Sequence, residues 1–239
     1  MKIAILGYGK MGQIIEKIAQ ERGHNILLKI NQHNIDELNI ENLKKADVVI
    51  DFSTPESAKT NIILSIDANK PIISGTTGWL DDYNEVKDYC IRNEGAFLYA
   101  SNFSLGVNLF FELNQNLAKL MKKHQQYQIN LTEIHHTEKL DAPSGTAISL
   151  AEQIISESDI KNKWTLNSEN SDEELKIDAQ RKENITGTHS VNYRSETDSI
   201  SIKHEAHSRN GFALGAVIAA EWMINKKGVF SMHDVLSSS

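Results

Sequence analysis

Two adjacent histidines, a lysine and a hydroxyl-bearing turn lie within a short stretch of this chain. Lys139 follows His135 and His136 closely, and Ser144-Gly145-Thr146 then opens an apolar segment with helical spacing. Histidine exchanges protons near neutral pH, and the N–H groups at a helix N-terminus bind carboxylates. These residues predict a pocket for a small carboxylate-bearing substrate that is protonated during its reaction.

Paired histidines also suggest a zinc site, but two observations count against it. Neighbouring residues of a strand point to opposite faces, so His135 and His136 would not chelate one ion. The partner four residues away that a helical metal site needs is missing as well. We therefore expect no metal. A third interpretation, in which the histidines are only satisfied in a turn, stays open on this evidence.

A glycine-rich loop near the N-terminus predicts dinucleotide binding. Gly7-Tyr8-Gly9-Lys10-Met11-Gly12 fits the pattern G-x-G-x-x-G, directly after a β-rich run and before an amphipathic helical segment. Glycine permits the tight turn and lets the backbone approach a pyrophosphate, while the following helix presents its N–H groups to the phosphates. A structural turn without a ligand is the alternative.

Two later segments belong to the same predicted site. Asn31 stands about 20 residues further on, where the adenosine ribose would be contacted. An acidic residue there favours NAD and a nearby Arg favours NADP, so Asn31 leaves the preference open. The small residues of Gly75-Thr76-Thr77-Gly78 follow a later apolar run and could line the nicotinamide end, although such a tetrapeptide is more often an ordinary turn.

The apolar pattern predicts the elements that must position these motifs. Up to residue 105, short apolar runs alternate with helical patterns, which is typical of a parallel sheet covered on both faces. The polar segment 156–184 is expected to be an irregular surface excursion. The other elements predicted after residue 105 are helices over 105–124, 147–155 and 212–223, and strands over 127–133, 188–193 and 199–207.

Composition excludes several classes of protein. The 239 residues are 40% hydrophobic and carry a formal net charge of −7, which argues against a disordered chain and a general nucleic-acid clamp. The single cysteine excludes an intrachain disulfide and suits a reducing compartment. With no signal peptide and no stretch of roughly 18 apolar residues, we expect a soluble, cytoplasmic protein without a membrane span.

Taken together, the motifs resemble those of the dihydrodipicolinate reductases, also named 4-hydroxy-tetrahydrodipicolinate reductases. The resemblance runs nearly end to end, and its most specific part is the block E-x-H-H-x-x-K-x-D-x-P-S-G-T-A, Glu133 to Ala147. The other matching segments are 7–12, Asp51-Phe52-Ser53, 75–78, Ser101-Asn102-Phe103-Ser104, Gly187-x-His189 and 204–215.

The resemblance implies a fold and a reaction. The fold would be α/β, with a Rossmann-type dinucleotide-binding domain over 1–105 and 211–239 and an α+β mixed-sheet domain over 106–210 for substrate binding and tetramerisation. NADH or NADPH would reduce a conjugated cyclic imine bearing two carboxylates, and the resulting enamine would be protonated to tetrahydrodipicolinate, on the route to diaminopimelate and lysine. The implied assembly is a homotetramer, with no nucleic-acid or membrane partner.

The resemblance also implies roles for single residues. His135 and Lys139 would handle the proton, with the donor left open between them, while His136, Ser144, Gly145 and Thr146 would hold the substrate. Glu183 stands where the family has a glycine, which could alter a turn. The expected coenzyme contacts are Gly7, Tyr8, Gly9, Lys10, Met11, Gly12, Asn31, Gly75, Thr76, Thr77, Ala100, Ser101, Asn102 and Phe103.

Two other functions stay open at this point. One is a related two-domain NAD(P)-dependent reductase that acts on another small imine or carbonyl acid, which failure to bind a pyridine dicarboxylate would favour. The other is a non-catalytic dinucleotide sensor. A sensor would not need His135 and Lys139 together, so inertness to their substitution would support it.

Overall fold

The structure is a computed structural model that describes residues 1–166 and 172–237. The chain divides into two compact units. Unit 1 consists of Met1–Leu105 and Asn210–Ser239, and unit 2 consists of Gly106–Arg209. The predicted fold class is confirmed, because unit 1 holds a parallel sheet between helices and unit 2 holds a mixed sheet. The role of each unit stays a prediction.

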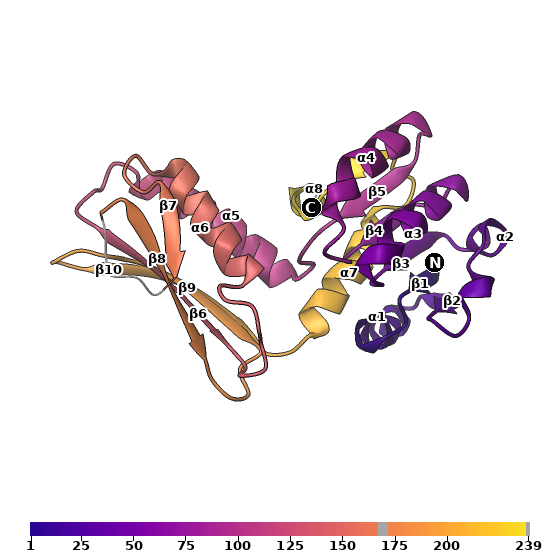
Figure 1. Ribbon diagram of the computed structural model, residues 1–239, viewed down its shortest axis with the longest axis horizontal. Coiled ribbons are helices and arrows are strands. Elements are labelled where there is room, and N and C mark those ends of the chain that lie inside the picture. The colour runs from indigo at the N-terminus through magenta and orange to yellow at the C-terminus, as the bar shows by residue number, and fades with distance from the viewer. Residues whose placement is uncertain (167–171, 238–239) are drawn as a thin grey trace. The chain divides into compact units, whose positions relative to one another are not determined.

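Unit 1 is built on a six-stranded parallel sheet with the order β11-β5-β4-β3-β1-β2 (Figure 1). Every residue of β3 and β4 is buried, which is why these strands are apolar almost throughout instead of alternating. The strands are β1 (Lys2–Leu6), β2 (Asn25–Ile30), β3 (Val48–Asp51), β4 (Ile72–Ser74), β5 (Ala96–Tyr99) and β11 (Gly228–Phe230).

Helices cover both faces of this sheet. On one face, α1 (Lys10–Glu21), α7 (Asn210–Trp222) and α8 (Met232–Ser237) bury their apolar residues. On the other lie α2 (Ile40–Leu43), α3 (Pro55–Asp67) and α4 (Tyr83–Arg92), with the single-turn 3-10 helices η1 (Ile35–Glu37) and η2 (Leu80–Asp82). This arrangement leaves the carboxyl ends of the parallel strands as the edge where ligands of such sheets bind.

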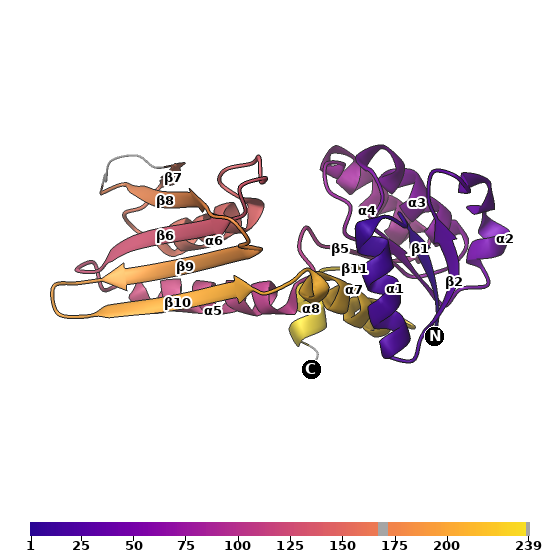
Figure 2. The ribbon, with the colours of Figure 1, turned by 90° about the horizontal axis from the view of Figure 1, so that it is seen from below.

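Unit 2 holds a five-stranded mixed sheet with the order β10-β9-β6-β8-β7 (Figure 2). Its apolar residues pack against α5 (Leu105–Met121) and α6 (Gly145–Glu157). Within residues 1–166 and 172–237, none of the helices combines the length and hydropathy needed to cross a bilayer. The strands are β6 (Gln128–His135), β7 (Lys163–Leu166), β8 (Glu174–Arg181), β9 (Gly187–Arg194) and β10 (Ser199–Ala206).

The prediction of an irregular excursion over 156–184 is wrong, because two strands, β7 and β8, lie in it. In β8, Leu175 and Ile177 are fully buried and alternate with polar residues. Leu175, Ile177 and Ala179 alternate with polar residues as in a half-buried strand, so the sequence does contain a signal for β8, which the polar composition of the whole segment outweighed in the prediction. Residues 167–171 of the segment lie outside the described part of the chain. The strand predicted over 127–133 is β6, which runs further, to His135.

Candidate functional site

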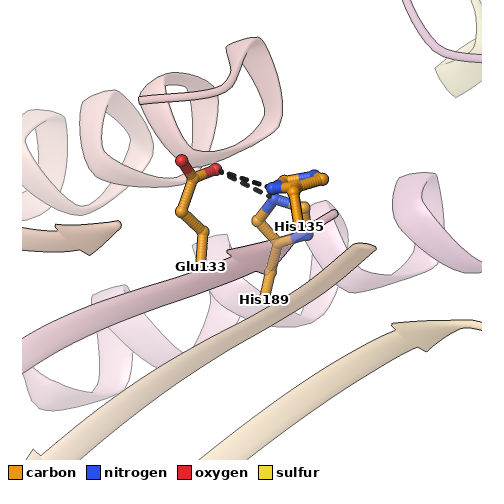
Figure 3. Close-up of side chains that lie close together, drawn as sticks. All are labelled: Glu133, His135 and His189. Carbon is orange, nitrogen blue, oxygen red and sulfur yellow. Dashed lines mark ion pairs between the residues drawn. The ribbon is translucent and has the colours of Figure 1, made fainter. Parts of the chain in front are cut away.

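A cluster of ionisable side chains lies at the end of β6. Glu133 and His135 are two residues apart on one strand, so they share a face of the sheet. The antiparallel register places His189 of β9 opposite Glu133. Figure 3 shows the result: one carboxylate oxygen of Glu133 lies 3.4 Å from Nδ1 of His135 and 3.7 Å from Nε2 of His189.

The Glu133 carboxylate is completely buried and remains ionised. The backbone N–H of Ser144 donates to both of its oxygens at 3.1 Å, and Nη1 of Arg181 lies 3.5 Å away. Burial acts to raise the pKa of Glu133, but hydrogen bonds from His189 and Ser144 and the nearby His135 outweigh it and lower the pKa to about 2. The cluster therefore contains a fixed negative charge.

Helix α6 begins beside this carboxylate. Ser144 is its N-cap, and its hydroxyl accepts the Ala147 N–H at 3.2 Å and lies 3.1 Å from Nε2 of His189. A β-carbon placed on Gly145 would meet no atom within 4 Å, so there is open space at the first turn. Among the described residues, the buried Nδ1 of His136 has no hydrogen-bond partner. The start of α6 thus fits an anionic ligand.

Lys139 lies in the loop between β6 and α6. Its ammonium donates to both carboxylate oxygens of Asp141, at 2.7 and 2.8 Å. Arg181, at the end of β8, donates to the backbone oxygens of Lys139 and Asp141, at 3.3 and 2.6 Å. The loop that carries Lys139 is therefore held by a side chain that sequence reasoning did not single out.

His135 is uncharged in this environment at neutral pH. Its burial lowers its pKa to about 4; Glu133 opposes this effect, whereas the charges of Lys139 and Arg181 add to it. Among the described residues, the buried Nδ1 of His135 has no hydrogen-bond partner, but the negative charge of Glu133 3.4 Å away favours the tautomer that carries its proton on Nδ1. The other nitrogen, Nε2, lies beside Gly187, where a β-carbon would stand only 3.2 Å from it.

A metal ion is a possible occupant of this cluster. Ligand atoms of Glu133, His135 and His189 all lie within 4.8 Å of one another. From the sequence, only His135 and His136 were considered as metal ligands. These three residues were missed because they come from two strands, β6 and β9. However, Arg181 already neutralises Glu133, and a divalent ion would add positive charge to a buried site. The geometry favours an ion pair with neutral histidines, and the absence of a metal stays a prediction.

The low pKa of His135 predicts that mild acid destabilises the fold. The unfolded chain takes up a proton at this histidine near pH 6.5, whereas the folded protein does so only near pH 4. The free energy of unfolding should fall by on the order of 3 kcal/mol between these values. Glu133, with a pKa of about 2, continues the loss below about pH 4.5. Denaturant titrations from pH 7 to pH 3 measure this dependence.

The His135→Gln variant is the control for this pH dependence. Glutamine does not titrate, so the variant should lose much less stability than the wild type between pH 6.5 and 4, with the part due to His204 remaining because burial also lowers the pKa of that histidine, and it should keep the loss below pH 4. An unchanged slope in the variant would contradict a neutral, buried His135.

The glycine loop of unit 1 has the shape that a dinucleotide requires. A β-carbon on Gly7, whose φ is +87°, would stand 2.1 Å from the Phe52 backbone oxygen, and one on Gly12 would stand 2.7 Å from the Gly7 oxygen. These two glycines are needed for the turn itself. A β-carbon on Gly9 would meet nothing within 4 Å, so the space above Gly9 is open to a ligand. The loop therefore fits a pyrophosphate at the start of α1.

Asn31 follows β2 directly at the same edge. The loop is tied to this strand because the N–H groups of Gly7 and Tyr8 donate to the Ile30 oxygen at 3.0 and 2.8 Å. The Asn31 side-chain oxygen accepts the His33 N–H at 2.8 Å. The bond leaves the amide NH2 of Asn31 as a donor, which suits a ribose hydroxyl or a phosphate oxygen equally.

The side-chain hydroxyl of Thr76 makes hydrogen bonds inside the protein. Its buried hydroxyl donates to Asp51 at 2.8 Å and accepts the Ser53 N–H at 2.8 Å. Three further side chains also donate to Asp51, namely Ser53, Asn61 and Ser74. The network joins the segments after β3 and β4. The Thr76 hydroxyl is therefore not available to a ligand, and the contacts predicted for this segment fall to the backbone and the exposed Thr77.

The remaining predicted residues take the following places. Ala100 to Phe103 follow β5, again at the carboxyl edge, and the Phe103 ring is buried against Phe52, with centroids 5.6 Å apart. Lys10 and Met11 lie in the first turn of α1. Glu183 is exposed in the turn between β8 and β9, where Asn184 has the left-handed φ of +61°, so Glu183 needs no glycine-like conformation.

Comparison with known proteins supplies the family. The model described as "Dihydrodipicolinate reductase, N-terminus" matches residues 1–103, and "Dihydrodipicolinate reductase, C-terminus" matches residues 106–236. The 4-hydroxy-tetrahydrodipicolinate reductase of Christiangramia forsetii is 50% identical, covering 99% of this chain and 98% of the relative. That of Rickettsia rickettsii is 34% identical, covering 95% of each chain.

A solved structure has the same fold. The dipicolinate-bound dihydrodipicolinate reductase from Paenisporosarcina sp. TG-14 superposes with a TM-score of 0.78 at 22% identity, over 97% of both chains. The family models cover nearly the whole chain and the first relative is half identical to it. This chain therefore belongs to the dihydrodipicolinate reductase family.

Proposed function

We propose that this protein reduces 4-hydroxy-tetrahydrodipicolinate, by way of dihydrodipicolinate, to tetrahydrodipicolinate in lysine biosynthesis. The observation that carries the proposal is the assembly at the end of β6. One block of the sequence there contains a buried, neutral His135, Lys139 in a loop that Arg181 holds, and the start of α6 with open space at its first turn. The block belongs to a chain 50% identical to a reductase of that name.

Members of the family use NADH or NADPH, whose reduced nicotinamide supplies the hydride. Unit 1 is the proposed dinucleotide-binding domain. The open space at Gly9 would take the pyrophosphate at the start of α1, and the amide of Asn31 would donate to the ribose. The segments after β4 and β5, Gly75 to Thr77 and Ala100 to Phe103, would line the nicotinamide end.

Unit 2 is the proposed substrate domain. The substrate's carboxylates would bind at His136 and at the start of α6, with Ser144, Gly145 and Thr146, where the helix favours negative charge. His135 and Lys139 are the proposed proton-handling pair. A neutral His135 can donate only after gaining a proton, and the two negative charges of a bound dicarboxylate favour that gain.

We also propose that unit 2 mediates a homotetramer. Helices α5 and α6 pack on one face of its sheet. The opposite face carries short polar side chains, among them Asn130, Thr132, Ser190 and Asn192, and other copies of the chain would cover it. Light scattering after gel filtration tests the tetramer.

The proposed location is the cytoplasm. The free, buried Cys90 suits a reducing compartment, which supports this location.

Gly9→Ala should weaken NADH and NADPH binding roughly tenfold or more without unfolding the protein. The backbone of Gly9, with φ −95° and ψ −152°, is accessible to alanine, and the new methyl group meets no protein atom. It would occupy the space assigned to the pyrophosphate. Fluorescence titration with the reduced coenzyme measures binding, and the melting temperature serves as the control. Unchanged affinity would place the coenzyme elsewhere.

The decisive assay couples this protein to dihydrodipicolinate synthase, which generates the unstable substrate in place. Oxidation of NADH or NADPH, followed by the loss of near-ultraviolet absorbance and inhibited by pyridine-2,6-dicarboxylate, would support the proposal. The ratio of the two rates measures the preference that Asn31 leaves open. If neither coenzyme is oxidised although both bind, another small imine or carbonyl acid is the substrate.

A further inference from the structure

An ion pair between the buried Glu133 carboxylate and the half-buried Arg181 guanidinium, 3.5 Å apart, connects the two residues of the proposed proton-handling pair. We propose that Glu133 and Arg181 act together as positioning residues, Glu133 for His135 and Arg181 for Lys139. This inference rests on the proposed function, since it concerns how that site is held. Neither residue was assigned a role by the sequence, and Arg181 lies on a strand that the sequence did not predict.

Glu133 fixes the orientation of His135. Its carboxylate, which is not exposed at all, lies 3.4 Å from Nδ1 of His135 without forming a hydrogen bond to it, and its negative charge favours the tautomer with the proton on that nitrogen. The same carboxylate receives the Ser144 N–H at both oxygens. One side chain therefore sets both the imidazole tautomer and the place where α6 begins.

Arg181 fixes the loop that carries Lys139. Its Nε and Nη2 donate to the backbone oxygens of Lys139 and Asp141, and Asp141 in turn binds the Lys139 ammonium. Its Nη1 lies 3.5 Å from Glu133. Only the planar guanidinium presents donors in so many directions at once. A lysine at this position would keep the charge but could not make both hydrogen bonds to the loop.

The backbone register of the sheet already places Arg181 next to His135. Arg181 is the register partner of His135 on the neighbouring parallel strand, and the Lys182 N–H donates to the His135 oxygen at 2.8 Å. A buried ion pair gives little net stability compared with apolar residues of similar size. Stability alone therefore does not explain this ion pair. Positioning the His135 imidazole on one side and the loop of Lys139 on the other does explain it.

Two single variants separate the halves. Glu133→Gln should lower kcat on the order of 10- to 100-fold, with a smaller change in KM, because the His135 ring loses the negative charge beside Nδ1. In ¹⁵N NMR spectra of the imidazole, the proton should no longer be confined to Nδ1. Arg181→Lys should leave the His135 signals unchanged and still lower kcat by roughly tenfold through Lys139. Arg194→Lys, the same change at the exposed end of β9, a strand of the same sheet that does not pair with β8, is the matched control and should have wild-type kinetics.

The double variant Glu133→Gln/Arg181→Met guards against misfolding. The change Glu133→Gln leaves Arg181 without its carboxylate partner, whereas the double change removes both charges, so the melting temperature of the double variant should lie closer to that of the wild type. Its kcat should stay at least tenfold low. Wild-type kcat in the double variant, or in a folded Glu133→Gln variant with unchanged imidazole signals, would overturn the inference. A wild-type protein that fails to reduce the substrate would instead refute the proposed function, and the NMR spectra would still test the Glu133 half.

Discussion

His135→Gln lowers kcat by a factor of roughly 10² to 10⁴ and leaves KM nearly unchanged, if His135 moves a proton in the reaction. Glutamine has a similar size and can hydrogen-bond, but it cannot take up and release a proton near neutral pH. In the structure Nδ1 of His135 lies 3.4 Å from the Glu133 carboxylate, while Nε2 lies close to Gly187, where a β-carbon would stand 3.2 Å from it. The substitution therefore removes proton transfer while leaving the proposed carboxylate site at the start of α6 in place. Steady-state kinetics with the coupled substrate measure both constants.

The control for this prediction is His124→Gln. His124 is exposed in the turn after α5 and should tolerate the change without effect on either constant. A His135→Gln variant within about threefold of the wild-type kcat would show that this residue does not handle the proton. The role would then pass to Lys139.

Gly215→Ala should lower the free energy of unfolding by about 3 kcal/mol or more. A β-carbon at this position of α7 would stand 1.7 Å from the backbone oxygen of Phe103. No rotamer change relieves a contact between two backbones, so α7 must move away from the segment that follows β5. That segment includes Ala100 to Phe103, and coenzyme binding should weaken as well. Denaturant unfolding, followed by circular dichroism, measures the loss.

Gly211→Ala is the matched change on the same helix. The nearest atom to its β-carbon is the Ser104 hydroxyl oxygen at 3.7 Å, an ordinary contact, and alanine favours a helix over glycine by about 0.5–1 kcal/mol. This variant should be as stable as the wild type or slightly more stable. Equal stability of the two variants would mean that α7 does not approach Phe103 as closely as described.

The parallel sheet of unit 1 and the block from which the site is built could both be predicted from the sequence. Strands β3 and β4 are buried on both faces, so their apolar runs can be read without knowing their neighbours. The G-x-G-x-x-G loop is a local requirement of backbone geometry, since Gly7 and Gly12 leave no room for a side chain. His135, Lys139 and the start of α6 lie in one contiguous segment, and a family resemblance can therefore be carried by that segment alone.

The contacts that hold these residues and set their charge form only in the folded protein and could not be predicted. Arg181 and His189 come from strands β8 and β9, and their places beside Glu133 follow from strand register, which no local pattern encodes. The neutral state of His135 depends on burial, and the commitment of the Thr76 hydroxyl depends on Asp51 from another strand. Residue types and spacing identify chemistry that neighbours in the chain can perform, whereas protonation and orientation are set by groups that only the folded sheet brings within a few ångströms.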